Sequence, residues 1–151
     1  MKAVIQRCTR ACVTVEGKVT GKIDKGFVVL LGIEQEDEIP QANAVADKIY
    51  SMRIFCDENG KINLSLKDVG GSVLVISNFT LCADCSHGNR PYFGEAAAPG
   101  KAEELYNYFC DRLSQKINVQ KGVFGADMKL ELLNDGPVTI IVDSRELKTK
   151  I

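Results

Sequence analysis

The chain has 151 residues, which fits a single domain spanning residues 1–151. Apolar residues make up 45% and charged residues 26%, the balance of an ordinary soluble globular protein. The formal net charge of −1 argues against a protein that binds long nucleic acid through a positively charged surface. It leaves open a pocket that takes only the end of a nucleic acid, because such a pocket needs few phosphate contacts.

The sequence predicts a cytoplasmic protein that does not cross a membrane. The longest apolar run, residues 27–33, is far shorter than the stretch of about 18 residues that suggests a transmembrane helix. The first 17 residues lack the apolar centre of a signal peptide. Without a secretion signal, we expect the six cysteines to be free thiols in a reducing compartment. They are Cys8, Cys12, Cys56, Cys82, Cys85 and Cys110.

In the first half of the chain, alternating apolar and β-branched residues predict strands. Gly17 lies in the expected turn of a hairpin. From Glu38 the apolar residues recur at spacings of three and four, which predicts a helix of about four turns with Pro40 in its first turn. The strands expected in this half are 2–8, 12–15, 19–23, 27–33, 62–66 and 72–77.

The second half predicts one more helix and three strands. Residues 83–100 form a long irregular stretch, and so long a connection in a compact domain is usually functional. Apolar residues from Ala102 to Ile117 mark one face of the second helix. The strands expected after it are 119–124, 129–133 and 138–142, with a turn at 134–137 between the last two.

The fold class that these elements predict is α+β. Strands joined by tight turns pair antiparallel, and two helices need an apolar surface to cover. We therefore expect a single domain with a curved or barrel-like, mostly antiparallel β-sheet and two packed α-helices.

Two patterns could carry familiar chemistry, and both lack support. Cys82 and Cys85 form a C-x-x-C with His87 close by, which suggests a zinc site or a redox dithiol, but no second cysteine pair has suitable spacing. A Ser-His-Asp system would have to use His87, the only histidine, together with Ser144 and a carboxylate such as Asp84 or Asp143. No G-x-S-x-G motif supports that system.

Two other segments stand out. Residues 77–84 follow the strongest predicted strand, and there the chain becomes small and polar as it enters the long loop. Such a place can offer hydroxyl and backbone N–H groups to a ligand. Residues 134–139 contain Gly136, which lets the backbone approach a ligand closely, and Pro137, which raises the chance of a cis peptide bond.

Along its whole length the chain resembles the D-aminoacyl-tRNA deacylases, the chiral proofreading enzymes of translation quality control. The two segments match the signature motifs of that family, usually written S-Q-F-T-L and N-x-G-P-V-T. The chain departs from the first motif at Asn78, where glutamine is usual, and just after it at Cys82, where tyrosine is common. Further matches lie at residues 3–7, 13–15, 26–32, 53–55, 61–65, 68–71, 88–91 and 124–128.

The resemblance implies a homodimer with two active sites, each formed across the subunit interface. Residues 77–81 of one chain would form the pocket wall, and Gly136-Pro137 of the partner would reach into the pocket with a cis peptide bond. Arg7 would support that segment. The expected catalytic residues are Thr80 and Phe79, and the expected substrate-binding residues are Ser77, Asn78, Leu81, Met128, Gly136 and Pro137.

The implied reaction is hydrolysis of the ester that joins a D-amino acid to the 3′ end of tRNA. Backbone N–H groups near Phe79 and Thr80 would stabilise the developing oxyanion. The 2′-hydroxyl of the tRNA would assist the attacking water, with no metal and no organic cofactor. The Gly136-Pro137 backbone would occupy the volume that an L side chain needs, so L substrates would be rejected. Glycine has no side chain to exclude, so glycyl-tRNA mischarged on tRNA-Ala would be accepted.

Two alternatives to this reading involve the same tRNA end. The protein could be a module that binds the end of a tRNA without cleaving it. It could also be the related deacylase that clears L-alanine from a mischarged tRNA, whose Gly-Pro bond is trans. A third alternative, from a different class, is the zinc or redox protein suggested by Cys82, Cys85 and His87.

Overall fold

The sheet is organised around one long strand. The structure is a computed structural model that describes residues 1–148, so the last three residues of the expected domain lie outside the described residues. Strand β1 (Lys2–Val15) pairs antiparallel on one side with β3 (Gly26–Gly32) along its first half and with β2 (Lys18–Ile23) along its second half. On its other side it pairs antiparallel with β8 (Lys129–Asp143) along most of its length.

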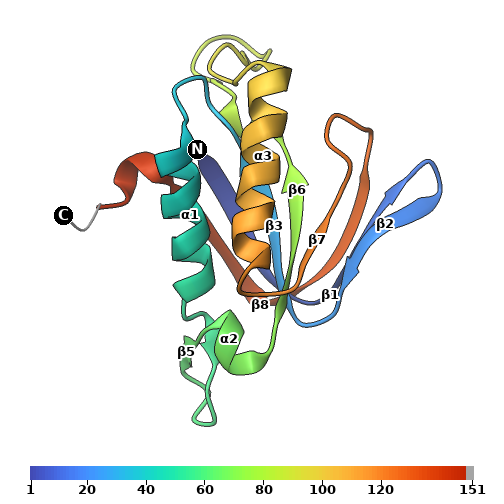
Figure 1. Ribbon diagram of the computed structural model, residues 1–151, viewed down its shortest axis with the longest axis vertical. Coiled ribbons are helices and arrows are strands. Elements are labelled where there is room, and N and C mark those ends of the chain that lie inside the picture. The colour runs from blue at the N-terminus through green and yellow to red at the C-terminus, as the bar shows by residue number, and fades with distance from the viewer. Residues whose placement is uncertain (149–151) are drawn as a thin grey trace.

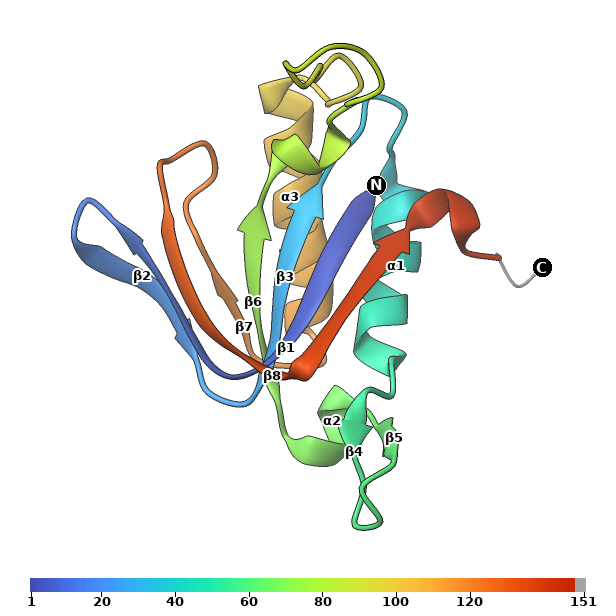
Figure 2. The same ribbon diagram turned by 180° about the vertical axis from the view of Figure 1, so that it is seen from behind.

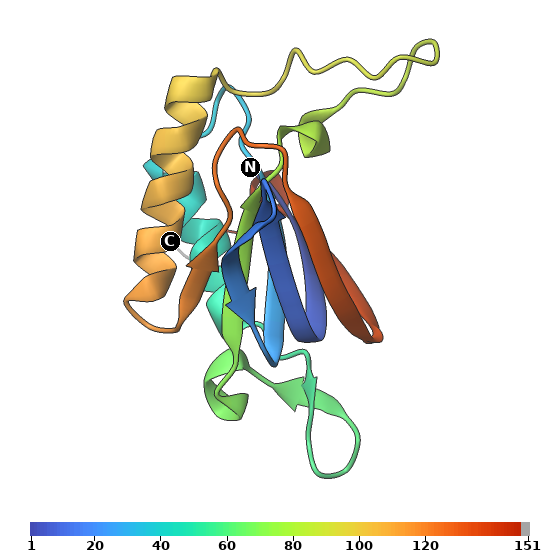
Figure 3. The ribbon, with the colours of Figure 1, turned by 90° about the vertical axis from the view of Figure 1, so that its right-hand side faces the viewer.

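The sheet continues beyond β3 through two parallel pairings. Strand β6 (Ser72–Ser77) pairs with β3, and β7 (Val119–Lys121) pairs with β6. Figures 2 and 3 show that the sheet curls strongly, so that the β1–β2 hairpin bends round toward β7. The approach is close, because a Cβ added to Gly21 of β2 would lie 2.7 Å from the Lys121 carbonyl oxygen of β7. The result is a nearly closed, barrel-like mixed sheet.

Two helices, α1 (Ile39–Ser51) and α3 (Pro99–Ser114), lie side by side against one face of the sheet (Figure 1). Each follows its predicted apolar spacing, and the Tyr106 hydroxyl of α3 donates a hydrogen bond of 2.7 Å to the Val75 carbonyl of β6. The remaining elements are short. They are β4 (Phe55–Cys56), β5 (Ile62–Leu64), α2 (Leu66–Val69) and the single 3-10 turns η1 (Phe79–Cys82) and η2 (Ser144–Glu146).

The core has two parts because both faces of the curled sheet carry apolar residues. The larger part lies between the sheet and the helices, where the rings of Phe27 and Phe55 stack with their centroids 5.0 Å apart. The smaller part fills the inside of the curl. Its buried residues are Cys8, Ala11, Val13, Ile23, Val28, Leu74 and Ile76.

The predicted fold class is confirmed: the chain is α+β, with a barrel-like sheet and two packed helices. None of the helices described over residues 1–148 is long and apolar enough to span a membrane. The pairing of the strands and some of their bounds differ from the prediction. Two strand pairs are parallel, and residues 66–69 form a short helix where the end of a strand was expected. The turn predicted at 134–137 is wrong, because β8 runs through those residues without reversing.

Candidate active site

The first motif begins at the end of β6, where the chain leaves the sheet and turns into η1. Asn78 N–H donates to the Leu31 carbonyl of β3 at 2.8 Å, which fixes the start of the turn. The first backbone bond of the turn runs from Leu81 N–H to the Asn78 carbonyl at 3.3 Å. Phe79 and Thr80 come before Leu81 in the turn. As at the start of any helix, the turn itself contains no carbonyl partner for their N–H groups, which can therefore donate to a ligand.

Gly32, at the end of β3, lets η1 lie this close to the sheet. A Cβ added to Gly32 would stand 2.9 Å from Leu81 Cβ and 3.1 Å from the Asn78 carbonyl oxygen. From the sequence, Gly32 is only part of a predicted strand that matches the family, with no connection to the site. No local pattern gives this contact, because it joins residues almost fifty positions apart.

The side chains of Phe79 and Thr80 both face solvent. Phe79 is 58% exposed, and its ring meets the Phe93 ring edge-on at a centroid distance of 5.2 Å. The long loop therefore touches the first motif through Phe93. The Thr80 hydroxyl donates to the Asn78 side-chain oxygen. An amide oxygen is no general base, so this contact does not activate Thr80 as a nucleophile.

Met128 lies near the end of β6, on the inner side of the curl. A Cβ added to Gly122 would come within 2.5 Å of the Met128 sulfur and 3.2 Å of the Ile76 side chain. Met128 is half-buried and packs against the smaller core. The neighbour of Ile76 in β6 is Ser77, so Met128 and the first motif border the same end of the sheet.

The second motif forms a large bulge in β8. Gln6 of β1 faces Thr139, and Cys8 faces Asn134, so the residues 135–138 stand opposite the single residue Arg7. Gly136 and Pro137 are exposed on this bulge, and the peptide bond between them is cis, as the sequence analysis expected. The backbone of the bulge therefore projects from the sheet.

Arg7 lies beneath the bulge and is 6% exposed. Its Nε donates to the Asp135 carbonyl at 3.0 Å, and its Nη1 donates to the Ile54 carbonyl at 2.8 Å. The Asp135 carboxylate lies 3.5 Å from Nε. The guanidinium thus ties the bulge to the chain between α1 and β4.

Within one chain the two motifs lie apart. Ser77 pairs with Leu31, and Leu31 pairs with Ala3, whereas the bulge faces Arg7. Ala3 and Arg7 are four residues apart along β1, which corresponds to roughly 13 Å of extended strand. Between β6 and β8 lie three strand spacings of about 4.8 Å each. Figure 2 shows η1 at the upper end of the sheet and the bend of β8 near its lower end. One chain alone therefore does not bring the predicted site residues together.

The residues of the alternative sites occupy separate environments. Cys82 is buried and its thiol donates to the Ile33 carbonyl at 3.6 Å, whereas Cys85 is exposed. Burial, with the Glu34 carboxylate as a second cause, raises the pKa of the Cys82 thiol. His87 pairs with its neighbour Ser86, 2.8 Å between Nδ1 and Oγ. In the described part of the chain, no group of three or more histidine, cysteine or acidic side chains is placed to hold a metal ion.

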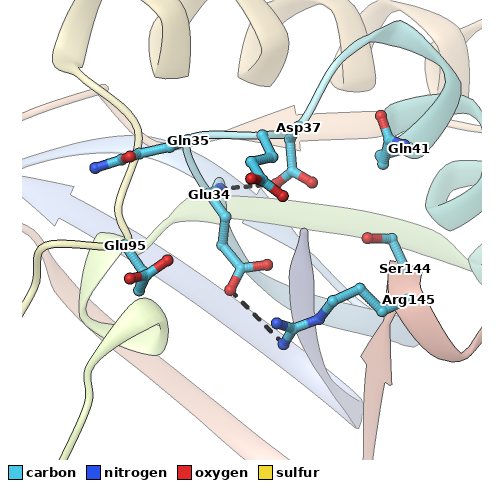
Figure 4. Close-up of a pocket in the computed structure, with 8 residues that line it drawn as sticks. Glu34, Gln35, Asp37, Gln41, Glu95, Ser144 and Arg145 are labelled. Carbon is cyan, nitrogen blue, oxygen red and sulfur yellow. Dashed lines mark hydrogen bonds and ion pairs between the residues drawn. The ribbon is translucent and has the colours of Figure 1, made fainter.

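A cavity of about 160 Å³ lies elsewhere, beside η2 (Figure 4). Some of its charged residues bind one another: Arg145 lies 3.8 Å from Glu34, and the Glu34 backbone amide donates to the Asp37 carboxylate at 2.7 Å. Glu34 and Asp37 also bind the amino group of Met1 at 3.0 and 2.6 Å. None of the residues lining the cavity belongs to either motif, so we assign it a structural role.

Comparison with known proteins matches residues 4–143 to the family model described as D-Tyr-tRNA(Tyr) deacylase. The D-aminoacyl-tRNA deacylase of Salmonella typhimurium is 55% identical over 140 residues, which cover 92% of this chain and 97% of that protein. The D-aminoacyl-tRNA deacylase of Escherichia coli O81 is 53% identical over the same shares of the two chains.

Two solved structures share the fold. The c-Myc DNA Unwinding Element Binding Protein superposes with a TM-score of 0.90 at 41% identity, covering 95% of this chain and 98% of its own. A probable eukaryotic D-amino acid tRNA deacylase superposes with a TM-score of 0.80 at 17% identity, covering 93% and 97%. The family match and the identity over nearly the whole chain establish that this chain belongs to the D-Tyr-tRNA(Tyr) deacylase family, a family of hydrolytic enzymes.

Proposed function

We propose that this enzyme hydrolyses the ester of D-aminoacyl-tRNA and releases free D-amino acid and reusable tRNA. It would thereby proofread translation in the cytoplasm. Family membership supports the reaction class, and each signature motif has exposed residues, Phe79 and Thr80 in the first and Gly136 and Pro137 in the second. The observation that carries the proposal is the position of Phe79 and Thr80 at the start of the exposed turn η1, where the first N–H groups have no carbonyl partner within the turn.

The proposed active site is formed by two copies of the chain. The separation of η1 from the bulge within one chain supports this arrangement, since the two motifs can meet only if one copy supplies each. Ser77, Asn78, Leu81 and Met128 of one chain would line the pocket for the 3′-terminal adenosine and its amino acid. Gly136 and Pro137 of the partner would close the pocket, and Arg7 of that same partner would hold them in place.

The proposed mechanism uses backbone groups rather than an acid–base side-chain pair. Water attacks the ester carbonyl, and the N–H groups of Phe79 and Thr80 stabilise the negative charge on its oxygen. The adjacent 2′-hydroxyl of the tRNA positions and polarises the water. The bond between the carbonyl carbon and the 3′-oxygen then breaks, and the 3′-oxygen takes a proton. Thr80 positions the substrate, because its hydroxyl faces the Asn78 amide oxygen and no base.

The proposed chiral filter is the exposed backbone of Gly136 and Pro137. Main-chain atoms do not swing between rotamers, so they exclude an L side chain whatever residue it belongs to. A D side chain would point to solvent and be accepted with little regard to its identity. Glycine has no side chain to exclude, so glycyl-tRNA mischarged on tRNA-Ala would also be cleaved.

The test is deacylation of matched D-tyrosyl-tRNA, L-tyrosyl-tRNA and glycyl-tRNA by the purified protein. The proposal expects rapid release of D-tyrosine and glycine and retention of L-tyrosine on tRNA. Binding of the acylated tRNA without release would favour the binding module. Cleavage of L-alanyl-tRNA with D-tyrosyl-tRNA intact would favour the alternative deacylase and contradict the filter.

A further inference from the structure

We propose that Asn134 is a positioning residue that fixes the projection of the bulge and thereby sets discrimination between D and L substrates. This inference rests on the proposed function of Gly136-Pro137. Asn134 is the first residue of the second motif, and the sequence alone assigns it no role.

The carboxamide of Asn134 joins the two ends of the bulge to each other and to β1. Its Nδ2 donates to the Val138 carbonyl at 3.0 Å and to the Arg7 carbonyl at 3.0 Å. A carboxamide nitrogen has two N–H donors, so both are used here. The first bond holds residue 138 against residue 134, and the second holds that pair on the strand beside it. The four residues between the register positions Asn134 and Thr139 are thus forced outward rather than spread along β1.

Arg7 and Asn134 hold different parts of the same bulge. The guanidinium binds the Asp135 carbonyl at the crest, whereas the carboxamide closes the base. Gly136 lies between these two anchors with φ at +133°, and an added Cβ would meet Val138 N at 2.9 Å and Arg7 Nη2 at 3.1 Å. Val138 packs beside Gly136, and its carbonyl accepts the hydrogen bond from Asn134. If the Asn134 carboxamide were removed, Val138 and Gly136 could therefore move together.

Loss of the Asn134 hydrogen bonds should change the discrimination between D and L substrates more than it changes the rate of ester cleavage. The proposed oxyanion donors belong to η1, which is fixed to β3 through Asn78, whereas the two side-chain hydrogen bonds of Asn134 lie within the bulge and to β1. A looser bulge would still leave those donors in place, but it would no longer fill the volume of an L side chain. The expected signature is therefore a gain of activity on L substrate relative to D substrate, rather than a uniform loss.

The experiment compares wild type, Asn134→Ser and Asn134→Leu on D-tyrosyl- and L-tyrosyl-tRNA, with Asn118→Leu as the matched control. Serine retains one donor, leucine retains none at similar size, and Asn118 donates to Ser72 Oγ at 3.1 Å far from the bulge. We expect the ratio of kcat/KM for D over L to fall about tenfold or more in Asn134→Leu, and by less in Asn134→Ser. Asn118→Leu should keep the wild-type ratio.

Melting temperatures of the same variants separate positioning from stability. Folded Asn134 variants with an unchanged D-to-L ratio would overturn the proposal. Equal loss of both activities, or failure of both variants to fold, would assign Asn134 to stability alone and overturn it as well. Failure of the wild-type protein to release D-tyrosine would instead refute the proposed function, so the two failures are distinguishable.

Discussion

Gly136 shows how strongly the geometry of the bulge depends on a single backbone position. Its φ of +133° lies in the region that favours glycine, and Val138 and Arg7 leave no room for a side chain. Any larger residue there must push the bulge away from Arg7. In contrast, the side chain of Thr80 is exposed and has one hydrogen-bond partner, the Asn78 side-chain oxygen. The chemistry that we propose therefore depends on backbone atoms and not on the Thr80 hydroxyl.

Replacing Thr80 should therefore matter less than altering the RNA. We expect Thr80→Ala to retain kcat/KM within about tenfold of wild type, because positioning is lost but the backbone N–H remains. A tRNA ending in 2′-deoxyadenosine should react at least about a hundredfold more slowly with the wild-type enzyme. Single-turnover deacylation measures both. Abolished turnover in Thr80→Ala, with normal cleavage of the deoxy tRNA, would assign the nucleophile to the protein.

The two cysteines of the C-x-x-C should differ in reactivity. Burial raises the pKa of the Cys82 thiol, so less of the reactive thiolate is present, and the chain also covers its sulfur. Cys85 is exposed. Brief treatment of native protein with iodoacetamide at pH 8, followed by peptide mass analysis, should label Cys85 and leave Cys82 unmodified until unfolding. Equal labelling, or an oxidised Cys82–Cys85 disulfide in protein purified without reductant, would revive the redox alternative.

At the scale of elements, the position of η1 depends on its contact with the end of β3. Gly32→Ala would place a Cβ 2.9 Å from Leu81 Cβ and 3.1 Å from the Asn78 carbonyl oxygen, so η1 must shift outward with its N–H groups. We expect kcat to fall about tenfold or more, since the donors no longer meet the oxyanion. Gly100→Ala is the matched control, because nothing lies within 4 Å of its added Cβ.

The control variant should gain stability while the test variant loses it. Gly100 lies in the first turn of α3, and alanine favours a helix by up to about 1 kcal/mol over glycine. Urea unfolding of both variants, together with D-tyrosyl-tRNA deacylation, checks the pair. Wild-type kcat in a folded Gly32→Ala protein would show that the placement of η1 does not control the reaction.

Local patterns predicted the elements well and their pairing less well. The α1 helix was expected because its apolar residues recur at helical spacing, and the β1–β2 hairpin because Gly17 marks its turn. Residues 134–137 have the composition of a turn, yet β8 continues through them. The partner strand decides whether such a segment reverses the chain or forms a bulge. Because β1 is long enough to pair with both halves of β8, the segment forms a bulge. That information is nonlocal, so short-range patterns could not supply it.

At the scale of the whole molecule, two features suit association with a second copy. Strand β8 pairs with β1 on one side, and a long edge strand invites pairing or cover. Large apolar side chains are also exposed on or near the motifs, with Ile141 of β8 at 74% and Phe79 of η1 at 58%. Family resemblance led to the expectation of a dimer, and the separation of the motifs within one chain gives that expectation a physical reason.

The dimer is directly measurable. Analytical ultracentrifugation at micromolar concentration should give a mass of twice 16.5 kDa, because each active site as proposed requires two chains. Activity per chain should fall on dilution below the dissociation constant. A species that sediments as a monomer and deacylates D-tyrosyl-tRNA at full rate would contradict the two-chain site.

The most direct test of the central claim is complementation between two inactive variants. Thr80→Pro removes one proposed oxyanion donor. Gly136→Val adds a side chain for which Val138 and Arg7 leave no room, so the bulge is forced outward into the proposed pocket and blocks the substrate, whereas loss of the Asn134 carboxamide only loosens the bulge. If each site takes η1 from one chain and the bulge from the other, a mixed dimer has one site with both defects and one intact site.

Random association of equal amounts makes half of the dimers mixed, so co-refolded protein should recover about a quarter of wild-type D-tyrosyl-tRNA deacylase activity. Each variant refolded alone should stay inactive. A mixture that forms mixed dimers, shown by differently tagged chains, but remains as inactive as its parents would contradict the account.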